Sequence, residues 1–160
     1  MQTPSSQSHL FITILILGLI AVTAAGCTGE RPSLGLNSGG GTLLPCPETP
    51  NCVSNDSTDE EHGIDPFVLA VPPDAAWKAV HEVLASMPRM VIIEDSGSYL
   101  HAEQTSRLMR YVDDLELAVV ADQGIIAVRS ASRLGKSDLG VNRERVEKLR
   151  AGLIELGAVR

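Results

Sequence analysis

The order of the periodic segments in the second half of the chain constrains the fold more than any other feature. Apolar residues recur at i, i+3, i+7 and i+10 in two places, as on one face of a helix. The first stripe follows Pro73 and stops at Pro88, and the second begins around Asn142. The residues of the two stripes are Trp77, Val80, Leu84 and Met87, and Val146, Leu149, Leu153 and Leu156. Each helix therefore needs another element on which to bury its apolar side.

Short segments rich in β-forming residues supply that element. Turn residues mark the connections at residues 95–98 and 122–124, and the second connection is short enough for a hairpin. One apolar run precedes the first helix and four lie between the helices. The five predicted strands are residues 67–71, 90–94, 99–105, 111–120 and 125–131.

The order strand, helix, four strands, helix predicts an α+β fold. A five-stranded antiparallel sheet with both helices on one face satisfies this order with short connections. In the strand 99–105, alternate residues face opposite sides, so we expect one side to be buried and the side of His101 and Glu103 to face solvent. The arrangement resembles one repeat of the TATA-binding protein fold and a trimmed helix-grip domain. These likenesses concern the fold and carry no function.

An apolar leader ends directly before a cysteine. Its core, residues 10–22, has the length of a secretory signal core and falls short of a spanning helix. The small residues 24–26 then precede Cys27, as in a bacterial lipoprotein signal, although no Lys or Arg precedes the core and Ala24 stands where Leu is preferred. We expect residues 1–26 to be cleaved and Cys27 to carry diacylglycerol and an amide-linked acyl chain. The alternatives are an uncleaved anchor or a secreted protein cut after Gly26.

The leader divides the chain and predicts its location. Residues 27–43 are expected to form the lipidated cysteine and a flexible linker, 44–65 a disulfide loop with an acidic segment, and 66–160 the α+β domain. The expected product is a monomeric lipoprotein of the cell envelope that faces the periplasm. Because Thr28 is not the Asp that retains lipoproteins at the inner membrane, the outer membrane is favoured if the cell has two.

The cysteine count agrees with this prediction. Acylation of Cys27 leaves Cys46 and Cys52 as an even pair, and export favours a disulfide between them. The alternatives are two free thiols or half of a metal site. His62 has no recognisable ligand spacing to the pair, so no metal site is expected.

Three sequence blocks resemble one family. They cover residues 44–54, 99–114 and 128–146. The blocks are similar to those of the bacterial and plastid family of unknown function catalogued as DUF 1499, over residues 44–154. The resemblance indicates the family but implies no activity, because the family has no settled biochemistry.

Charge and composition exclude some functions. The formal net charge of −7 disfavours binding to nucleic acid or to anionic lipid through bulk electrostatics. Phe, Trp and Tyr make up 3% of the chain, which makes an aromatic stacking platform improbable. No phosphate-binding loop is present, and we expect no cofactor.

Arg129 lies in an apolar strand and should have a carboxylate partner. Because the register is uncertain by one residue, Glu103, Asp113, Asp114 or Glu116 could supply it. One interpretation is a network of ion pairs that fixes residues 132–142 over the domain.

The other interpretation is a binding site for an anion or small molecule, since Arg recognises carboxylate and phosphate with two hydrogen bonds. The candidate ligand-binding residues are Arg107, Arg110, Asp113, Arg129, Ser132, Arg133, Asp138 and Asn142. The favoured function is accordingly a binding or assembly module of the envelope.

Two alternatives stay open. A hydrolase-type enzyme could use His101 and Glu103 as a base and its orienting partner. A nucleophile in a recognisable frame is missing, and residues i and i+2 share a face in any strand. A protein-interaction module could instead use the proline-rich disulfide loop or an open sheet edge to contact an envelope protein.

Overall fold

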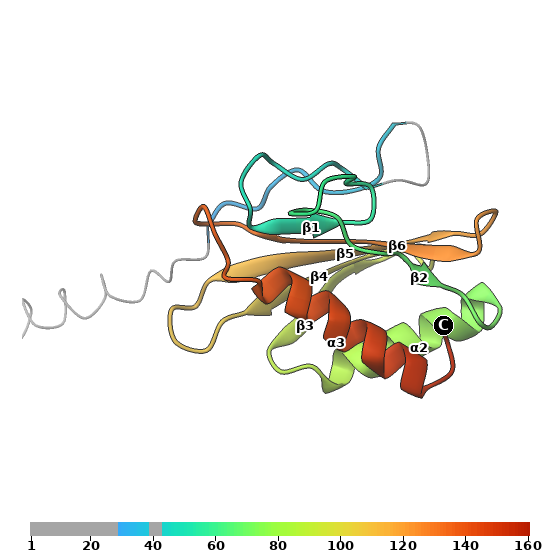
Figure 1. The fold of residues 1–160 in the computed structure, drawn as a ribbon. Coiled ribbons are helices and arrows are strands. Elements are labelled where there is room, and N and C mark those ends of the chain that lie inside the picture. The colour runs from blue at the N-terminus through green and yellow to red at the C-terminus, as the bar shows by residue number, and fades with distance from the viewer. Residues whose placement is uncertain (1–28, 39–42) are drawn as a thin grey trace, which may run out of the picture.

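The computed structural model describes residues 29–38 and 43–160. The predicted signal peptide and the predicted acylation site, Cys27, therefore lie outside the described residues. Neither helix of the described part of the chain combines the length and the hydropathy that crossing a bilayer requires. The two helices lie together on one side of a single sheet, and the described segments before residue 66 lie mainly on its other side (Figure 1).

All strand pairs of the sheet are antiparallel, which confirms the α+β prediction. The spatial order is β1-β6-β5-β4-β3, and β2 also pairs with β6. The strands are β1 (Cys52–Ser54), β2 (Phe67–Val68), β3 (Met90–Asp95), β4 (Tyr99–Thr105), β5 (Val112–Val120) and β6 (Ile125–Ser132). The sheet has one more strand than predicted, because the three residues of β1 pair with one end of β6 while β2 pairs with the other end.

Helices α2 (Pro73–Ser86) and α3 (Val141–Glu155) begin in different ways. Pro73 and Asp74 occupy the first turn of α2, where a missing N–H costs nothing and an acidic side chain suits the helix dipole. At the start of α3, the carboxylate of Asp138 accepts hydrogen bonds from the backbone N–H groups of Gly140 and Asn142, at 3.0 and 2.9 Å. Asp138 therefore caps α3 from outside the helix.

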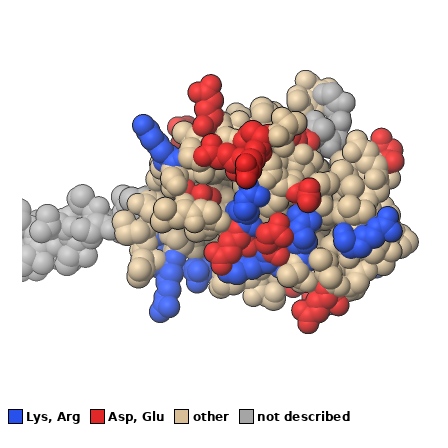
Figure 2. Space-filling view, viewed as in Figure 1, with Lys and Arg blue, Asp and Glu red and all other residues tan. Residues whose placement is uncertain are grey.

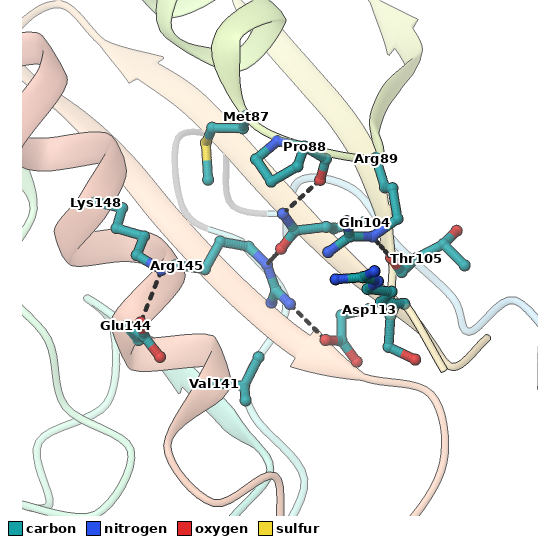
Figure 3. Close-up of a pocket in the computed structure, with 12 residues that line it drawn as sticks. Met87, Pro88, Arg89, Gln104, Thr105, Asp113, Val141, Glu144, Arg145 and Lys148 are labelled. Carbon is teal, nitrogen blue, oxygen red and sulfur yellow. Dashed lines mark hydrogen bonds and ion pairs between the residues drawn. The ribbon is translucent and has the colours of Figure 1, made fainter. Parts of the chain in front are cut away.

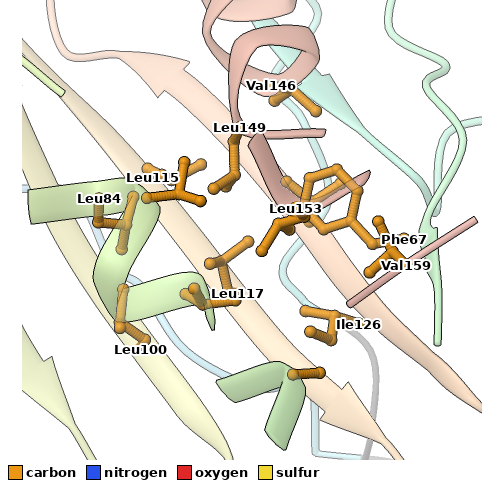
Figure 4. Packing of buried hydrophobic residues seen from close by; sticks show 14 of the residues in the cluster. Phe67, Leu84, Leu100, Leu115, Leu117, Ile126, Val146, Leu149, Leu153 and Val159 are labelled. Atoms are coloured by element: carbon orange, nitrogen blue, oxygen red, sulfur yellow. The ribbon is translucent and has the colours of Figure 1, made fainter. Parts of the chain in front are cut away.

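The main core lies between the helices and the sheet. Both predicted helical stripes contribute to it except Leu156, which follows the end of α3 and is exposed. Alternate residues of β4, β5 and β6 meet the stripes from the other side (Figure 4). Fully buried members include Leu84, Leu100, Leu117, Leu149 and Leu153. The helical repeat of 3.6 residues and the strand repeat of 2 residues thus place these apolar side chains in one buried layer.

The second face of the sheet does not face solvent, and that expectation was wrong. Tyr99, His101 and Arg129 are buried there. Polypeptide preceding the helices covers them: Leu43 is 1% exposed and packs in a second cluster with Tyr99. The predicted disulfide between Cys46 and Cys52 is present in this covering segment.

Residues 29–38, which we expected to form part of a flexible linker, are bonded to the sheet. Arg31 binds Glu103 of β4, and the backbone N–H of Gly35 donates to Glu116 of β5 at 2.7 Å. An isolated antiparallel β-bridge also joins Leu36 to Leu43. The Gly- and Ser-rich composition did not reveal these contacts, because they depend on charges and backbone groups distant in sequence.

Candidate functional site

Ionisable side chains of three adjacent strands and one loop meet on the covered face of the sheet. Strand register explains their proximity, since His101 lies opposite Glu116, Glu103 opposite Asp114, and Glu116 opposite Arg129. We call this set the covered-face network. Its members are Tyr99, His101, Glu103, Asp114, Glu116, Arg129 and Arg133.

Of the four carboxylates proposed above as partners of Arg129, Glu116 is the one that pairs with it. Its Oε2 accepts a hydrogen bond from Arg129 Nη1 at 2.8 Å, and its Oε1 accepts one from the Tyr99 hydroxyl at 2.9 Å. Glu116 is fully buried, so these partners and the N–H of Gly35 replace its hydration. Burial and the neighbouring Glu116 carboxylate raise the pKa of Tyr99 well above its ordinary value. Tyr99 is therefore a neutral hydrogen-bond donor.

Arg133 is held by two carboxylates. Its Nε and Nη2 donate to the two oxygens of Asp114 at 2.9 and 2.7 Å, and Nη2 also donates to Glu103 at 2.5 Å. Burial alone would raise the pKa of Asp114, but the hydrogen bonds from Arg133 and His101 outweigh it and lower that pKa. The pKa of Glu103 is likewise lowered against burial by Arg133 and Arg31. Both carboxylates are thus held ionised by their partners.

His101 and Glu103 share a strand face but are not partnered with each other. His101 Nε2 lies 2.8 Å from Asp114 Oδ1, while Glu103 binds Arg133 and Arg31. The carboxylate that orients His101 is therefore Asp114. One oxygen or nitrogen atom from each of His101, Glu103 and Asp114 lies within 4.8 Å of the others. A metal ion there would compete with the guanidinium of Arg133 for both carboxylates.

A second polar cluster fixes the loop between β6 and α3. The buried side-chain amide of Asn142 donates to Asp138 Oδ2 at 2.8 Å, to Ser132 Oγ at 2.9 Å and to the backbone oxygen of Asn51 at 3.0 Å. Asn51 in turn donates to the backbone oxygen of Ser132 at 3.2 Å. Hydrogen bonds from Asn142 and Gly140 lower the pKa of Asp138 although burial alone would raise it. Ser132, Asp138 and Asn142 therefore have structural partners.

Arg145, which the sequence argument missed, organises a third site on the helix side of the sheet. It is 3% exposed and lies on the inward face of α3. Its guanidinium donates to Gln104 Oε1 at 2.7 Å, to Ser130 Oγ at 2.8 Å, and to Asp113. The available signal was its spacing, because Arg145 lies four residues before Leu149 on the buried stripe.

An open cavity of about 280 Å³ lies beside Arg145 (Figure 3). We call it the Arg145 cavity. Its charged lining residues are the cations Arg89, Arg107, Arg145 and Lys148 and the carboxylates Asp113 and Glu144.

Two of these cations are already paired. Arg145 binds Asp113, and Lys148 binds Glu144 at 2.7 Å. Arg89 donates from Nε to the backbone oxygen of Thr105 at 2.7 Å. Within residues 29–38 and 43–160, neither Arg89 nor Arg107 has a carboxylate partner. The cavity thus has two more cations than carboxylates, in a chain whose net charge is −7.

The structure separates the eight candidate ligand-binding residues into different places. Arg129 and Arg133 belong to the covered-face network, and three others fix the β6–α3 loop, as described above. Asp113 and Arg107 line the Arg145 cavity. Arg110 lies in the exposed loop between β4 and β5 with a positive φ of 60°. These eight residues therefore do not form a single arginine-rich sheet face.

The fold and these sites define a class: a small α+β domain with a largely buried polar network on one face of its sheet and a cation-lined cavity on the other. The chain belongs to the family described as "Protein of unknown function (DUF1499)", whose sequence profile matches residues 42–153. This match confirms the resemblance carried by the three sequence blocks. No curated protein matches the chain.

Proposed function

We propose that this protein is a membrane-anchored binding module of the cell envelope, and that the Arg145 cavity takes a small anion or the anionic group of a larger molecule. The observation that carries the proposal is the pair Arg89 and Arg107, two guanidinium groups at one cavity that have no carboxylate partner among residues 29–38 and 43–160. Arginine forks match the geometry of carboxylate and phosphate oxygens.

Arg145 adds a fixed cation to the cavity. Hydrogen bonds to Gln104, which is part-buried, and to Ser130, which is buried, hold its guanidinium in place before any ligand arrives. An anion that bound here would not have to order this side chain, which lowers the entropic cost of binding. The exposed pair of Lys148 and Glu144 at the rim is weaker and can rearrange.

The envelope location rests on the leader and the cysteines. The apolar segment before Cys27 predicts export and a lipid anchor, and the Cys46–Cys52 disulfide suits an oxidising compartment. In this proposal the protein faces the periplasm, in the outer membrane of a cell that has two. Metabolic labelling of cells with a radioactive fatty acid tests the anchor by comparing the wild type with Cys27→Ser. Equal labelling of the two proteins would contradict it.

Thermal unfolding tests the anion site. We expect inorganic phosphate, added at constant ionic strength, to raise the melting temperature by about 4 °C per kcal/mol of binding stabilisation. Arg89→Gln and Arg107→Gln should each reduce this rise. Lys78→Gln is the matched control, since it removes an exposed cation of α2 outside the cavity. Equal phosphate effects in all three variants and the wild type would rule out the site.

A hydrolase-type enzyme is the alternative, and the His101–Asp114 pair favours it. His101 lines a hollow of about 650 Å³ together with Arg31 and Ile93. No hydroxyl or thiol of the described chain is hydrogen-bonded to the His101 ring, so water would have to act as nucleophile. Ester and phosphoester screening of wild type and His101→Ala decides the matter, because equal background rates remove this alternative.

An assembly role has support at the sheet edge. β3 is an edge strand, and its residues Val91, Ile92 and Ile93 are exposed. Such an edge can pair with a strand of another protein. A partner crosslinked in intact cells should be lost with Val91→Lys and kept with Leu156→Lys, a matched change at an exposed residue after α3. Recovery of the same partner with both variants would count against this edge.

A further inference from the structure

Two loops at one end of the sheet lie next to each other. The β4–β5 loop (residues 106–111) and the β6–α3 loop (residues 133–140) are both at the left end of Figure 1. The N–H of Arg133 donates to the backbone oxygen of Val112 at 3.3 Å, which joins the bases of the two loops. Residues of both loops, including Tyr111, Leu134 and Leu139, line a common hollow.

These loops expose apolar side chains that the fold does not use. The described residues expose twelve large apolar side chains, and six of them lie in the two loops or directly beside them. The most exposed are Leu139, at 95%, and Leu108, at 86%. The six are Leu108, Met109, Tyr111, Leu134, Leu139 and Val141. A concentration of this kind marks a surface that contacts an apolar partner.

The charge of the same end is opposite to that of the protein. Arg107, Arg110 and Lys136 are exposed in the two loops, whereas Asp138, their only carboxylate, caps α3. Lys and Arg side chains project from this left end in the space-filling view (Figure 2). Local attraction to an anionic surface is therefore compatible with a net charge of −7, because exposed charges act over about 10 Å in salt.

The chain also leads toward the membrane at this end. Gly29 lies against the base of the β6–α3 loop, where a Cβ on Gly29 would be 2.9 Å from Arg133 Cβ and 3.0 Å from Leu134 Cγ. Cys27 is two residues earlier, so an extended chain places it within about 7 Å of Gly29. A lipid on Cys27 and an uncleaved apolar leader both put the bilayer within reach of these loops.

We propose that the two loops dock the domain onto an anionic phospholipid bilayer. The exposed leucines enter the interface between headgroups and acyl chains, and the three cations contact lipid phosphates, as in other interfacial segments. The docking surface consists of residues 106–111 and 134–141. This inference rests on the membrane anchor of the proposed function and not on the Arg145 cavity.

Depth-dependent quenching tests the docking. The full chain is made with its leader, purified from the membrane fraction in detergent, and reconstituted into vesicles of phosphatidylethanolamine and phosphatidylglycerol. Leu139→Trp introduces a fluorophore into the surface, and Ile154→Trp is the matched control near the end of α3. Lipids brominated on the acyl chain should quench about half or more of the emission that Leu139→Trp adds over wild type. They should leave the emission added by Ile154→Trp unchanged.

Two further comparisons, one of lipid headgroups and one of protein charge, identify what attracts the loops to the bilayer. Replacing phosphatidylglycerol by phosphatidylcholine should reduce the quenching. The triple change Arg107→Gln/Arg110→Gln/Lys136→Gln should also reduce it, by about fivefold in the docking equilibrium for each charge. Quenching that is equal at residues 139 and 154, or absent at both, would overturn the docking surface.

Failure of the docking surface can be distinguished from failure of the proposed function. A chain that stays in the vesicles without quenching at residue 139 overturns docking and leaves the anchor intact. A chain that does not sediment with membranes overturns the anchor and the docking together. Loss of the phosphate effect on melting temperature overturns only the anion cavity.

Discussion

On the covered face of the sheet, three arginines meet three carboxylates, whereas around the Arg145 cavity four cations meet two carboxylates. The first set is Arg31, Arg129 and Arg133 with Glu103, Asp114 and Glu116. It is balanced in charge and covered by residues of the N-terminal segment. The second set is open to solvent and retains a surplus of two positive charges. Arginine content alone therefore does not distinguish the two sets; they differ in the number of carboxylates and in their exposure to solvent.

The strongest test of the balanced set is removal of Glu116. Glu116→Leu leaves the Arg129 guanidinium buried without a counterion, so we expect a loss of about 3–5 kcal/mol in the free energy of unfolding. Urea unfolding measures it. The double change Glu116→Leu/Arg129→Met should recover part of this loss, because an apolar pair avoids the buried charge. A double variant less stable than Glu116→Leu would contradict this account.

Removal of Arg145 tests the open set. Arg145→Met leaves Asp113 and Gln104 without their donor, and we expect it to cost about 1–3 kcal/mol in unfolding free energy. It should also reduce the phosphate-induced rise in melting temperature. A variant that loses stability but keeps the full phosphate effect would show that Arg145 is structural only.

Acid titration tests the ion pairs of the balanced set. The pKa values of Asp114 and Glu103 are lowered in the folded protein, so the unfolded chain binds more protons as the pH falls below about 4. Stability is therefore fully present above that pH and is lost as the pH falls through the folded pKa values. Arg133→Gln should flatten this dependence in urea midpoints measured against pH. Arg107→Gln serves as the control and should leave the slope as in wild type.

The smallest expected effect concerns the rim of the cavity. Glu144→Gln frees Lys148 from its exposed ion pair, and phosphate affinity should rise by about twofold. Isothermal titration at low salt measures the change, and high salt should abolish it. Weaker phosphate binding in this variant would mean that Lys148 does not contribute to the cavity.

Much of the fold could be predicted because its signals are local. Both helical stripes and the alternation in β4, β5 and β6 are periodic, and the turn residues mark their ends. β1 was missed because three residues carry no periodicity. The cover on the second face was missed for another reason: polar residues such as His101 and Glu103 at alternate positions have the pattern of a solvated face.

The sites were less predictable because they depend on register and on distant segments. Arg129 was expected to have a carboxylate partner, but the choice of Glu116 needed the pairing of β5 with β6. The cavity depends on Arg145, which lies in a helix rich in charged residues and resembles a surface residue in the sequence. Arg107 was a candidate, yet its separation from Arg129 and Arg133 needed the three-dimensional structure.

The contacts of Arg31 and Gly35 with the sheet also limit how far the domain can lie from the start of the predicted linker at residue 28. A free linker of the 16 residues 28–43 would span up to about 54 Å when extended. With Arg31 bound to Glu103 and Gly35 to Glu116, the segment from Arg31 to Gly35 is fixed to the sheet and does not lengthen a linker. Under the proposed lipid anchor on Cys27, the domain would stay close to the membrane, and a pulling force on the anchor would load β4 and β5 directly.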